Sequence, residues 1–241
     1  MGDISIREYI RWLPDPPSEP TSTIVLTSPE RRFVDIRILR EPEPSPDGIL
    51  PPSSLDWAIA GTSTSTSSST PGSSSPSHST WTHWIDSRHP LNPESFSDAG
   101  DMYPQPDGTV LERGSMVNPS TSILTKYEEL WRDEPVVPDH LNSEGKPVCV
   151  VLELGRGEGE GGKKRGMVVR LGQYCQALVR DGDSVLVERM RWDGETGMWV
   201  RLVRIGEGEM PVEWAAYFGG EATVGDEVKV GGDVWTVVER C

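Results

Sequence analysis

The feature that most constrains this fold is the spacing of the apolar residues, which recur in short runs without the sustained 3.6-residue period of a long amphipathic helix. Runs such as VCVVLEL (residues 148–154) are separated by turn signals, among them Asp181-Gly182-Asp183 and Gly231-Gly232. Many short strands joined by tight turns, without helical crossovers, indicate antiparallel sheet. Because closing a sheet into a barrel removes its exposed edges, we predict an all-β protein built from barrels.

Charge and composition limit the partners that this chain can have. Its formal net charge of −15 suits it poorly to a phosphate backbone, so we expect no nucleic-acid partner. No apolar run is long enough to cross a bilayer, so we expect no membrane insertion. The first residues, MGDISIREYI, lack the apolar core of a signal peptide, which favours an intracellular protein.

An internal similarity indicates that the barrel occurs twice. The segment LDWAIAG (residues 55–61) resembles VEWAAYFG (residues 212–219). Each is preceded by a long hairpin pattern and followed by a segment that begins Gly-Asp and ends in Glu-Arg. We therefore predict an N-terminal barrel in residues 1–143 and a C-terminal barrel in residues 144–241.

A low-complexity tract lies inside the first of these units. In GTSTSTSSSTPGSSSPSHST (residues 61–80), fifteen of the twenty residues are Ser or Thr and none is a large apolar residue. Composition alone suggests a linker. The internal similarity instead assigns the segments before and after the tract to one unit. We therefore predict a disordered insertion at about residues 61–80, between two neighbouring strands of the first barrel.

Several segments together resemble the fungal Hri-type proteins, a family named for association with a casein-kinase-I-like kinase. The resemblance implies two tandem lipocalin-like (calycin-like) antiparallel β-barrels in a cytoplasmic and nuclear protein without established catalytic activity. It implies no catalytic or ligand residues. As partners it suggests that kinase and a component of the protein-translocation machinery at the endoplasmic reticulum. The segments that carry it include TIVLTSPERRFVDIRIL, LDWAIAGTS, DAGDMYPQPDGTVLERG, YEELWRD and RLGQYCQALVRDGDSVLVERMRW.

Motifs that would bind a cofactor or a metal lack their required context. The glycines of GRGEGEGGKKRG (residues 155–166) have the spacing of a phosphate-binding loop, but the strand-like MVVRLG follows where a helix is needed. His83 and His89 flank Asp86 without the three or four converging ligands that a metal needs. We therefore expect no cofactor and no metal.

Catalytic constellations are also missing from the sequence. Cys175, within GQYCQALV, is expected to be a small buried residue and not an activated thiolate. The segment TKYEELW (residues 125–131) fits either a short helix or a strand. We favour a strand with Tyr127, Glu129 and Trp131 on one face, so that Glu128 points away from Glu129. We therefore expect no catalytic residues and no enzymatic activity.

The tryptophans are the remaining candidates for a binding site. A small barrel either fills its interior with side chains or encloses a cavity for one small ligand. Packing in the core is one interpretation of the strand-borne tryptophans, and the lining of an apolar ligand pocket is the other. The candidate pocket residues are Trp57, Trp84, Trp131, Trp192 and Trp214.

Three functional hypotheses follow from these observations. The first is a non-enzymatic protein-interaction module. The second is a carrier that holds a small apolar ligand in a barrel cavity. The third, an enzyme that uses such a cavity, lacks a visible acid, base or nucleophile. An open barrel interior would distinguish the second hypothesis from the first.

Overall fold

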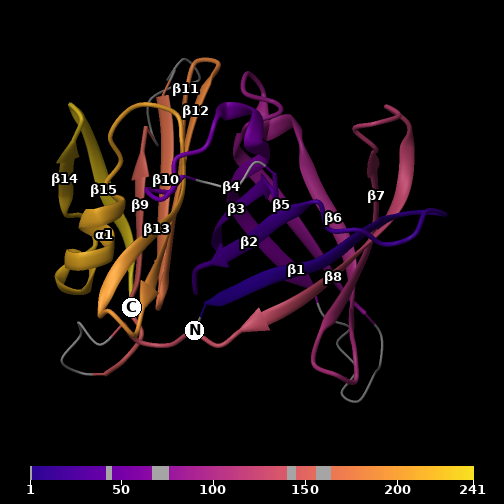
Figure 1. The fold of residues 1–241 in the computed structure, drawn as a ribbon, viewed down its shortest axis with the longest axis horizontal. Coiled ribbons are helices and arrows are strands. Elements are labelled where there is room, and N and C mark those ends of the chain that lie inside the picture. Colours follow the sequence, from indigo (N-terminus) through magenta and orange to yellow (C-terminus); the bar gives the residue numbers. More distant parts are fainter. Residues whose placement is uncertain (1, 42–44, 67–75, 140–144, 156–163) are drawn as a thin grey trace.

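The computed structural model describes residues 2–41, 45–66, 76–139, 145–155 and 164–241, and it consists of two β-sheets (Figure 1). The first is a closed eight-stranded antiparallel barrel in which sequential strands are neighbours. The all-β prediction is confirmed, as is the closed N-terminal barrel. The strands of the barrel are β1 (Asp3–Trp12), β2 (Thr21–Thr27), β3 (Arg32–Leu39), β4 (Leu55–Thr66), β5 (Ser77–Asp86), β6 (Ser97–Pro104), β7 (Val110–Val117) and β8 (Leu124–Glu134).

The second sheet has seven strands in the order β13-β12-β11-β10-β9-β15-β14. Since β13 and β14 are its two ends, it is an open sheet, and the prediction of a second closed barrel is wrong. The physical reason is that both of its faces are covered by other elements, so closure is not needed to bury them. Its strands are β9 (Cys149–Leu154), β10 (Lys164–Leu171), β11 (Tyr174–Asp181), β12 (Ser184–Asp193), β13 (Met198–Ile205), β14 (Glu227–Val230) and β15 (Asp233–Arg240).

One face of the second sheet packs against the outside of the barrel. The junction is a continuous aliphatic core to which strands β1 to β5 of the barrel and β9 to β13 of the sheet contribute. Figure 1 shows the two sheets facing each other across it. Its buried members are Ile4, Ile24, Leu26, Val34, Ile36, Ile38, Leu50, Ala58, Ala60 and Ile85 from the barrel side and Cys149, Val151, Met167, Val169, Leu171, Tyr174, Leu178, Val187, Val203 and Ile205 from the sheet.

The opposite face of the second sheet is covered by the helix α1 (Val212–Phe218). Val212, Ala215 and Ala216 are its buried residues, and they pack on a cluster that includes Trp235. Three short 3-10 helices complete the described elements: η1 (Pro52–Ser54), η2 (Pro93–Ser95) and η3 (Gly219–Glu221). No helix formed by the described residues combines the length and apolar character needed to span a bilayer.

The internal similarity holds for the flanking hairpins, which are β2–β3 and β12–β13 before the repeated segment and β6–β7 and β14–β15 after it, but it fails for the segment itself. LDWAIAG lies in strand β4, whereas VEWAAYF forms helix α1. Tertiary context decides the difference: the alternate residues Trp57 and Ile59 face the barrel interior, while Ala215 and Ala216 present a small helical surface to the sheet. Segments with the same residue pattern therefore adopt different structures.

The Ser/Thr tract is more ordered at its ends than predicted. Strands β4 and β5 are antiparallel neighbours, and their pairing extends into the tract as far as Thr66 opposite His78. The prediction of disorder from residue 61 to 80 is therefore wrong at both ends, because alternate polar side chains there line the interior of the barrel and the other face is solvated. Residues 67–75 lie outside the described residues, as do the glycines at 156–163.

Candidate functional site

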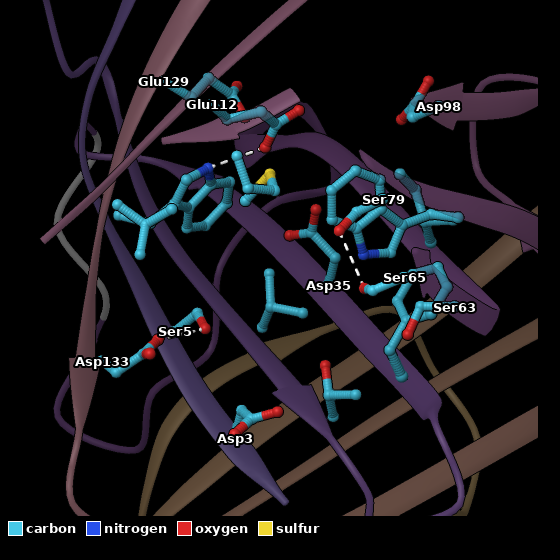
Figure 2. A pocket seen from close by; sticks show the side chains of 18 of the residues that line it. Asp3, Ser5, Asp35, Ser63, Ser65, Ser79, Asp98, Glu112, Glu129 and Asp133 are labelled. Atoms are coloured by element: carbon cyan, nitrogen blue, oxygen red, sulfur yellow. Dashed lines mark hydrogen bonds between the residues drawn. The ribbon is translucent and has the colours of Figure 1, made fainter. Parts of the chain in front are cut away.

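The interior of the barrel contains a cavity of about 270 Å³, lined by side chains from all eight strands (Figure 2). Because side chains alternate along a strand, the residues next to those of the junction core point inward. On β3, Phe33, Asp35 and Arg37 line the cavity, whereas Val34 and Ile36 belong to the junction.

One part of the cavity wall is apolar. Val25, Phe33, Ile59 and Trp131 line it and form a buried cluster together with Trp57. Three further lining residues pack against this cluster: Trp81, Met102 and Met116. Aromatic and thioether side chains of this kind suit a small molecule with an apolar portion.

A carboxylic acid next to this apolar wall is held by two neutral donors. The Tyr127 hydroxyl donates to Glu112 Oε1 at 2.6 Å, and Trp131 Nε1 donates to Glu112 Oε2 at 2.9 Å. Burial raises the pKa of Glu112 to about 8, the charge of Glu129 adds to the rise, and the two hydrogen bonds oppose it. Glu112 and Glu129 are direct register partners on β7 and β8.

Two glycines make room for this arrangement. Gly114 is opposite Tyr127 in the pairing of β7 with β8, and a Cβ at Gly114 would lie 2.5 Å from the Tyr127 hydroxyl oxygen. At Gly100 on β6, a Cβ would lie 2.6 Å from Cγ of Glu112. Both positions therefore require glycine for the buried acid and the tyrosine to fit.

A ladder of buried ion pairs continues from this wall. Arg37 Nε donates to Asp35 Oδ2 at 2.9 Å, and Arg37 Nη1 lies 3.4 Å from Glu129 Oε1. Arg7 Nη1 donates to the same Glu129 oxygen at 2.6 Å, while Arg7 Nε donates to Glu19 at 2.8 Å. Burial opposes the charge on Arg37, but Asp35 and Glu129 outweigh it and raise the pKa of Arg37.

Serines and acids line the rest of the cavity. Ser65 and Ser79 are hydrogen-bonded through their hydroxyl groups at 2.9 Å, and Ser5 Oγ donates to Asp133 Oδ1 at 2.7 Å. Figure 2 shows these two pairs on different sides of Asp35 in the view chosen. The cavity therefore combines an apolar surface with many hydrogen-bond acceptors.

A histidine–aspartate cluster lies next to the cavity. Asp86 accepts hydrogen bonds from Trp57 Nε1 at 2.8 Å and is 2.9 Å from Nδ1 of both His83 and His89. Burial opposes protonation of His83, but Asp86 and Asp98 outweigh it and raise the pKa of His83 to about 9. Nδ1 of both histidines is already bonded to the Asp86 carboxylate. We therefore interpret the cluster as a structural ion-pair network beside the cavity and not as a set of converging metal ligands.

Another group of potential metal ligands joins the two sheets. Cys149, Glu239 and Cys241 offer ligand atoms within 4.8 Å of one another. Glu239 already accepts hydrogen bonds from Ser28 Oγ at 2.6 Å and from the Glu30 amide at 2.8 Å. Burial, with the neighbouring Cys241, raises the pKa of the Cys149 thiol. Protonated sulfur and a committed carboxylate make this group a poor metal site.

The five candidate tryptophans are spread over three cores. Trp131 lines the barrel cavity, and Trp57 packs in the cluster behind it. Trp84 packs at the junction, whereas Trp192 and Trp214 belong to the core under helix α1. The structure therefore brings two of the five together at the cavity.

The sequence reading also missed several residues that define the cavity. Trp81, Glu112 and Asp35 line it, yet none stands in a motif. The available signal was alternation: in VLERGSMV (residues 110–117), Val110, Glu112 and Met116 share the face that looks inward. Two expectations are confirmed. Tyr127, Glu129 and Trp131 share the inward face of β8, and Cys175 is buried.

Comparison with known proteins places this architecture in a family. The family model described as Protein HRI1 matches residues 3–239, nearly the whole chain. The chain belongs to the HRI1 family. The Hri-type resemblance of the sequence is thereby confirmed.

The HRI1-family fold is also found in a solved structure. The crystal structure of the uncharacterized protein YLR301w from Saccharomyces cerevisiae matches with a TM-score of 0.76 and 17% sequence identity. The match covers 100% of this chain and 99% of that one. At this identity the likeness concerns the fold. No curated protein matches the sequence.

Proposed function

We propose that this HRI1-family chain is a non-enzymatic binding protein that holds a small, partly apolar molecule inside its N-terminal barrel. The supporting observation is the cavity of about 270 Å³ that the closed eight-stranded sheet encloses. An eight-stranded barrel is just wide enough either to be filled by side chains or to hold one small ligand. Under this proposal the barrel corresponds to the carrier folds of the lipocalin-like (calycin-like) type.

The side chains of the cavity support binding more than catalysis. Both oxygens of Glu112 accept hydrogen bonds from protein donors, and Glu129 is held by Arg7 and Arg37. Protein groups already occupy these hydrogen-bonding positions, whereas an acid–base catalyst must be within hydrogen-bond reach of its substrate. Among the lining serines, Ser5 donates to Asp133 and Ser65 is bonded to Ser79, so these hydroxyl groups are paired with an acid and with each other and not with a histidine. This arrangement favours a static binding site.

The proposal is tested by filling the cavity. Ser63 lines it and is buried, whereas the neighbouring Thr62 is exposed on the outside of the same strand. The probe is N-phenyl-1-naphthylamine, a neutral dye whose fluorescence rises in apolar surroundings. We expect saturable binding to the unaltered protein, at least tenfold weaker binding to Ser63→Phe, and unchanged binding to the matched control Thr62→Phe.

The same titration can refute the proposal. Equal binding by Ser63→Phe and Thr62→Phe would place the dye outside the barrel. An absence of binding to the unaltered protein would show that the cavity admits no apolar molecule of this size. Circular dichroism of both variants establishes that each is folded before the titrations are compared.

A second candidate function, a protein-interaction module, is supported by the edge strand β13. Met198, Val200 and Leu202 on this strand are exposed, with Met198 at 56%. β13 is an edge strand of the second sheet. At its C-terminal end, Arg204 forms backbone hydrogen bonds with Gly48 and Leu50. Among the described residues, the N-terminal part of β13 is therefore available to pair with an added strand. The partners suggested by the family resemblance are a casein-kinase-I-like kinase and an endoplasmic-reticulum translocation component, met in the cytoplasm or nucleus.

This second candidate has its own test. Affinity capture from a fungal extract is carried out with the unaltered protein and with Val200→Lys, which places a charge on the exposed edge. We expect a partner that the unaltered protein retains and the variant loses. Identical captured proteins in both samples would contradict a role for this edge.

A further inference from the structure

The most informative atom in the cavity is one carboxylate oxygen of Asp35. The side chain lines the cavity and is 6% exposed. Its Oδ2 is bound by Arg37, but Oδ1 accepts no hydrogen bond from the described residues. A buried acceptor without a donor costs about 1–3 kcal/mol, so a group that enters the cavity and donates a hydrogen bond there gains by binding.

The surroundings of Asp35 are apolar along the sheet. Its register partners on the neighbouring strands are Val25 on β2 and Ile59 on β4. Phe33 lies two residues earlier on the same face of β3. A donor that reaches Oδ1 is thus accompanied by an aliphatic and aromatic surface, which suits a molecule with one polar end and one apolar end.

The charges of the lining favour a cation over an anion. The basic groups near the wall are committed, because Arg37 bridges Asp35 and Glu129 while Arg31 pairs with Asp3 at 3.3 Å. The pKa of Glu112 is about 8, which leaves it largely protonated at neutral pH. The lining still contains more carboxylates than guanidinium groups: Asp3, Asp35, Asp98, Glu129 and Asp133 against Arg31 and Arg37. Two further cations pair with these acids from outside the lining, Arg7 with Glu129 and His83 with Asp98, so five carboxylates face four cations.

We propose that the ligand of the barrel carries a protonated amine, which pairs with Asp35 Oδ1 while a compact apolar group packs on Val25, Phe33 and Ile59. This inference rests on the proposed function and names the chemical class of its ligand. A carboxylate or phosphate ligand would face the excess of acids without a free guanidinium. A neutral alcohol would satisfy Oδ1 but leave that excess of negative charge unpaired.

The test compares three probes that share a phenyl ring and differ in charge. Phenethylamine, 2-phenylethanol and phenylacetate are titrated into the full chain by isothermal calorimetry at pH 7. We expect phenethylamine to bind at least tenfold more tightly than 2-phenylethanol, and phenylacetate to bind most weakly. In Asp35→Asn the amine and the alcohol should bind with about equal affinity.

A matched variant controls for overall charge. Asp101 lies on the outward face of β6, where it pairs with His78, so Asp101→Asn removes one negative charge without changing the cavity. We expect this variant to keep the tenfold preference. Because the comparison of three probes uses the unaltered protein, it remains decisive if Asp35→Asn does not fold.

The outcomes separate the inference from the function on which it rests. If 2-phenylethanol binds as tightly as phenethylamine, the barrel is a ligand site but the inference of an amine is wrong. If Asp35→Asn keeps the full preference, Asp35 is not the counter-ion and the assignment fails. If none of the three probes binds, the result counts against both the inference and the proposed function.

Discussion

Where the second sheet packs on strands β1 to β5, both faces of the barrel wall are buried, yet they differ in almost every other property. The outer face is an aliphatic core pressed against the second sheet. The inner face surrounds a cavity lined by acids, serines and aromatic rings. On β3 the contrast is between neighbours, since Ile36 belongs to the junction and Asp35 to the cavity. Since both faces are buried, the extent of burial does not distinguish them. The chemical character of the side chains does, because the outer face is aliphatic and the inner face carries acids and serines.

The buried polar groups of the two regions show the same contrast. Arg189 lies in the junction, and its guanidinium donates to Gln176 at 2.6 Å and to the carbonyl oxygen of Ile36 at 2.7 Å. Burial lowers the pKa of Arg189 to about 10, and neutral acceptors bind it. In the cavity, by contrast, Asp35 retains an oxygen without a donor. Arg189 in the junction is satisfied by protein acceptors, whereas Asp35 in the cavity has an acceptor oxygen available for a guest or solvent.

The largest expected difference concerns two isoleucines on opposite faces. Ile36→Ala leaves a void in the filled junction and should lower the free energy of unfolding by about 3–4 kcal/mol. Ile59→Ala enlarges a space that already exists, so mainly the transfer cost of the deleted carbons remains, about 2 kcal/mol. Urea denaturation of both variants measures the two values. Equal losses would contradict the distinction between a filled and a hollow face.

The next prediction concerns Glu112. Burial raises the pKa of this carboxyl from 4.5 to about 8. Because the pKa is higher in the folded state, protonated Glu112 favours folding fully below pH 4.5, and this contribution to the free energy of unfolding is lost as the pH rises through 8. At about 1.4 kcal/mol per pH unit, Glu112→Gln should gain roughly 2–3 kcal/mol relative to the unaltered protein between pH 5 and pH 7. Denaturation at a series of pH values measures this, and parallel stability curves would show that Glu112 titrates normally.

The histidine next to the cavity should act in a different pH window. The pKa of His83 is raised from 6.5 to about 9, so its stabilising pair with Asp86 is complete below pH 6.5 and is lost as the pH rises through 9. The unaltered protein should therefore lose about 2 kcal/mol between pH 7 and pH 9. His83→Gln should not show this loss. Thermal denaturation across the window measures it, and a loss that persists in the variant would assign it to another group.

The smallest expected effect is that of the Ser/Thr tract. The strands on either side of it are already paired from Thr62 to Thr66, so replacing residues 67–75 by a short turn should change the free energy of unfolding by less than about 1 kcal/mol. Denaturation of the shortened chain measures this. A loss of several kcal/mol would mean that the tract contributes to the barrel beyond its ends.

Features of this fold that depend on neighbouring residues in the sequence could be predicted, whereas features that depend on contacts between distant segments could not. Alternation along single strands predicted the inward face of Tyr127, Glu129 and Trp131 correctly, because a strand alternates whatever it contacts. Helix α1 was missed because seven residues are too few to show a helical period. The open second sheet was missed because its cover is the barrel itself, a contact between distant segments.

The candidate site was less accessible to sequence reasoning than the fold. Glu112 and Glu129 are separated along the chain and meet only through the register of β7 and β8. Cys149 and Cys241 likewise meet only after the strands have paired. That Asp35 keeps an unbound oxygen depends on the arrangement of all its neighbours, which no local pattern encodes.

The claim that the barrel interior is a binding site is tested most directly by native mass spectrometry of the protein purified from its own cells without denaturation. Our account predicts a small-molecule mass on the unaltered chain that is absent from Ser63→Phe and retained by Thr62→Phe. Detection of the bare chain mass in all three samples would contradict it. So would an adduct that Ser63→Phe carries equally.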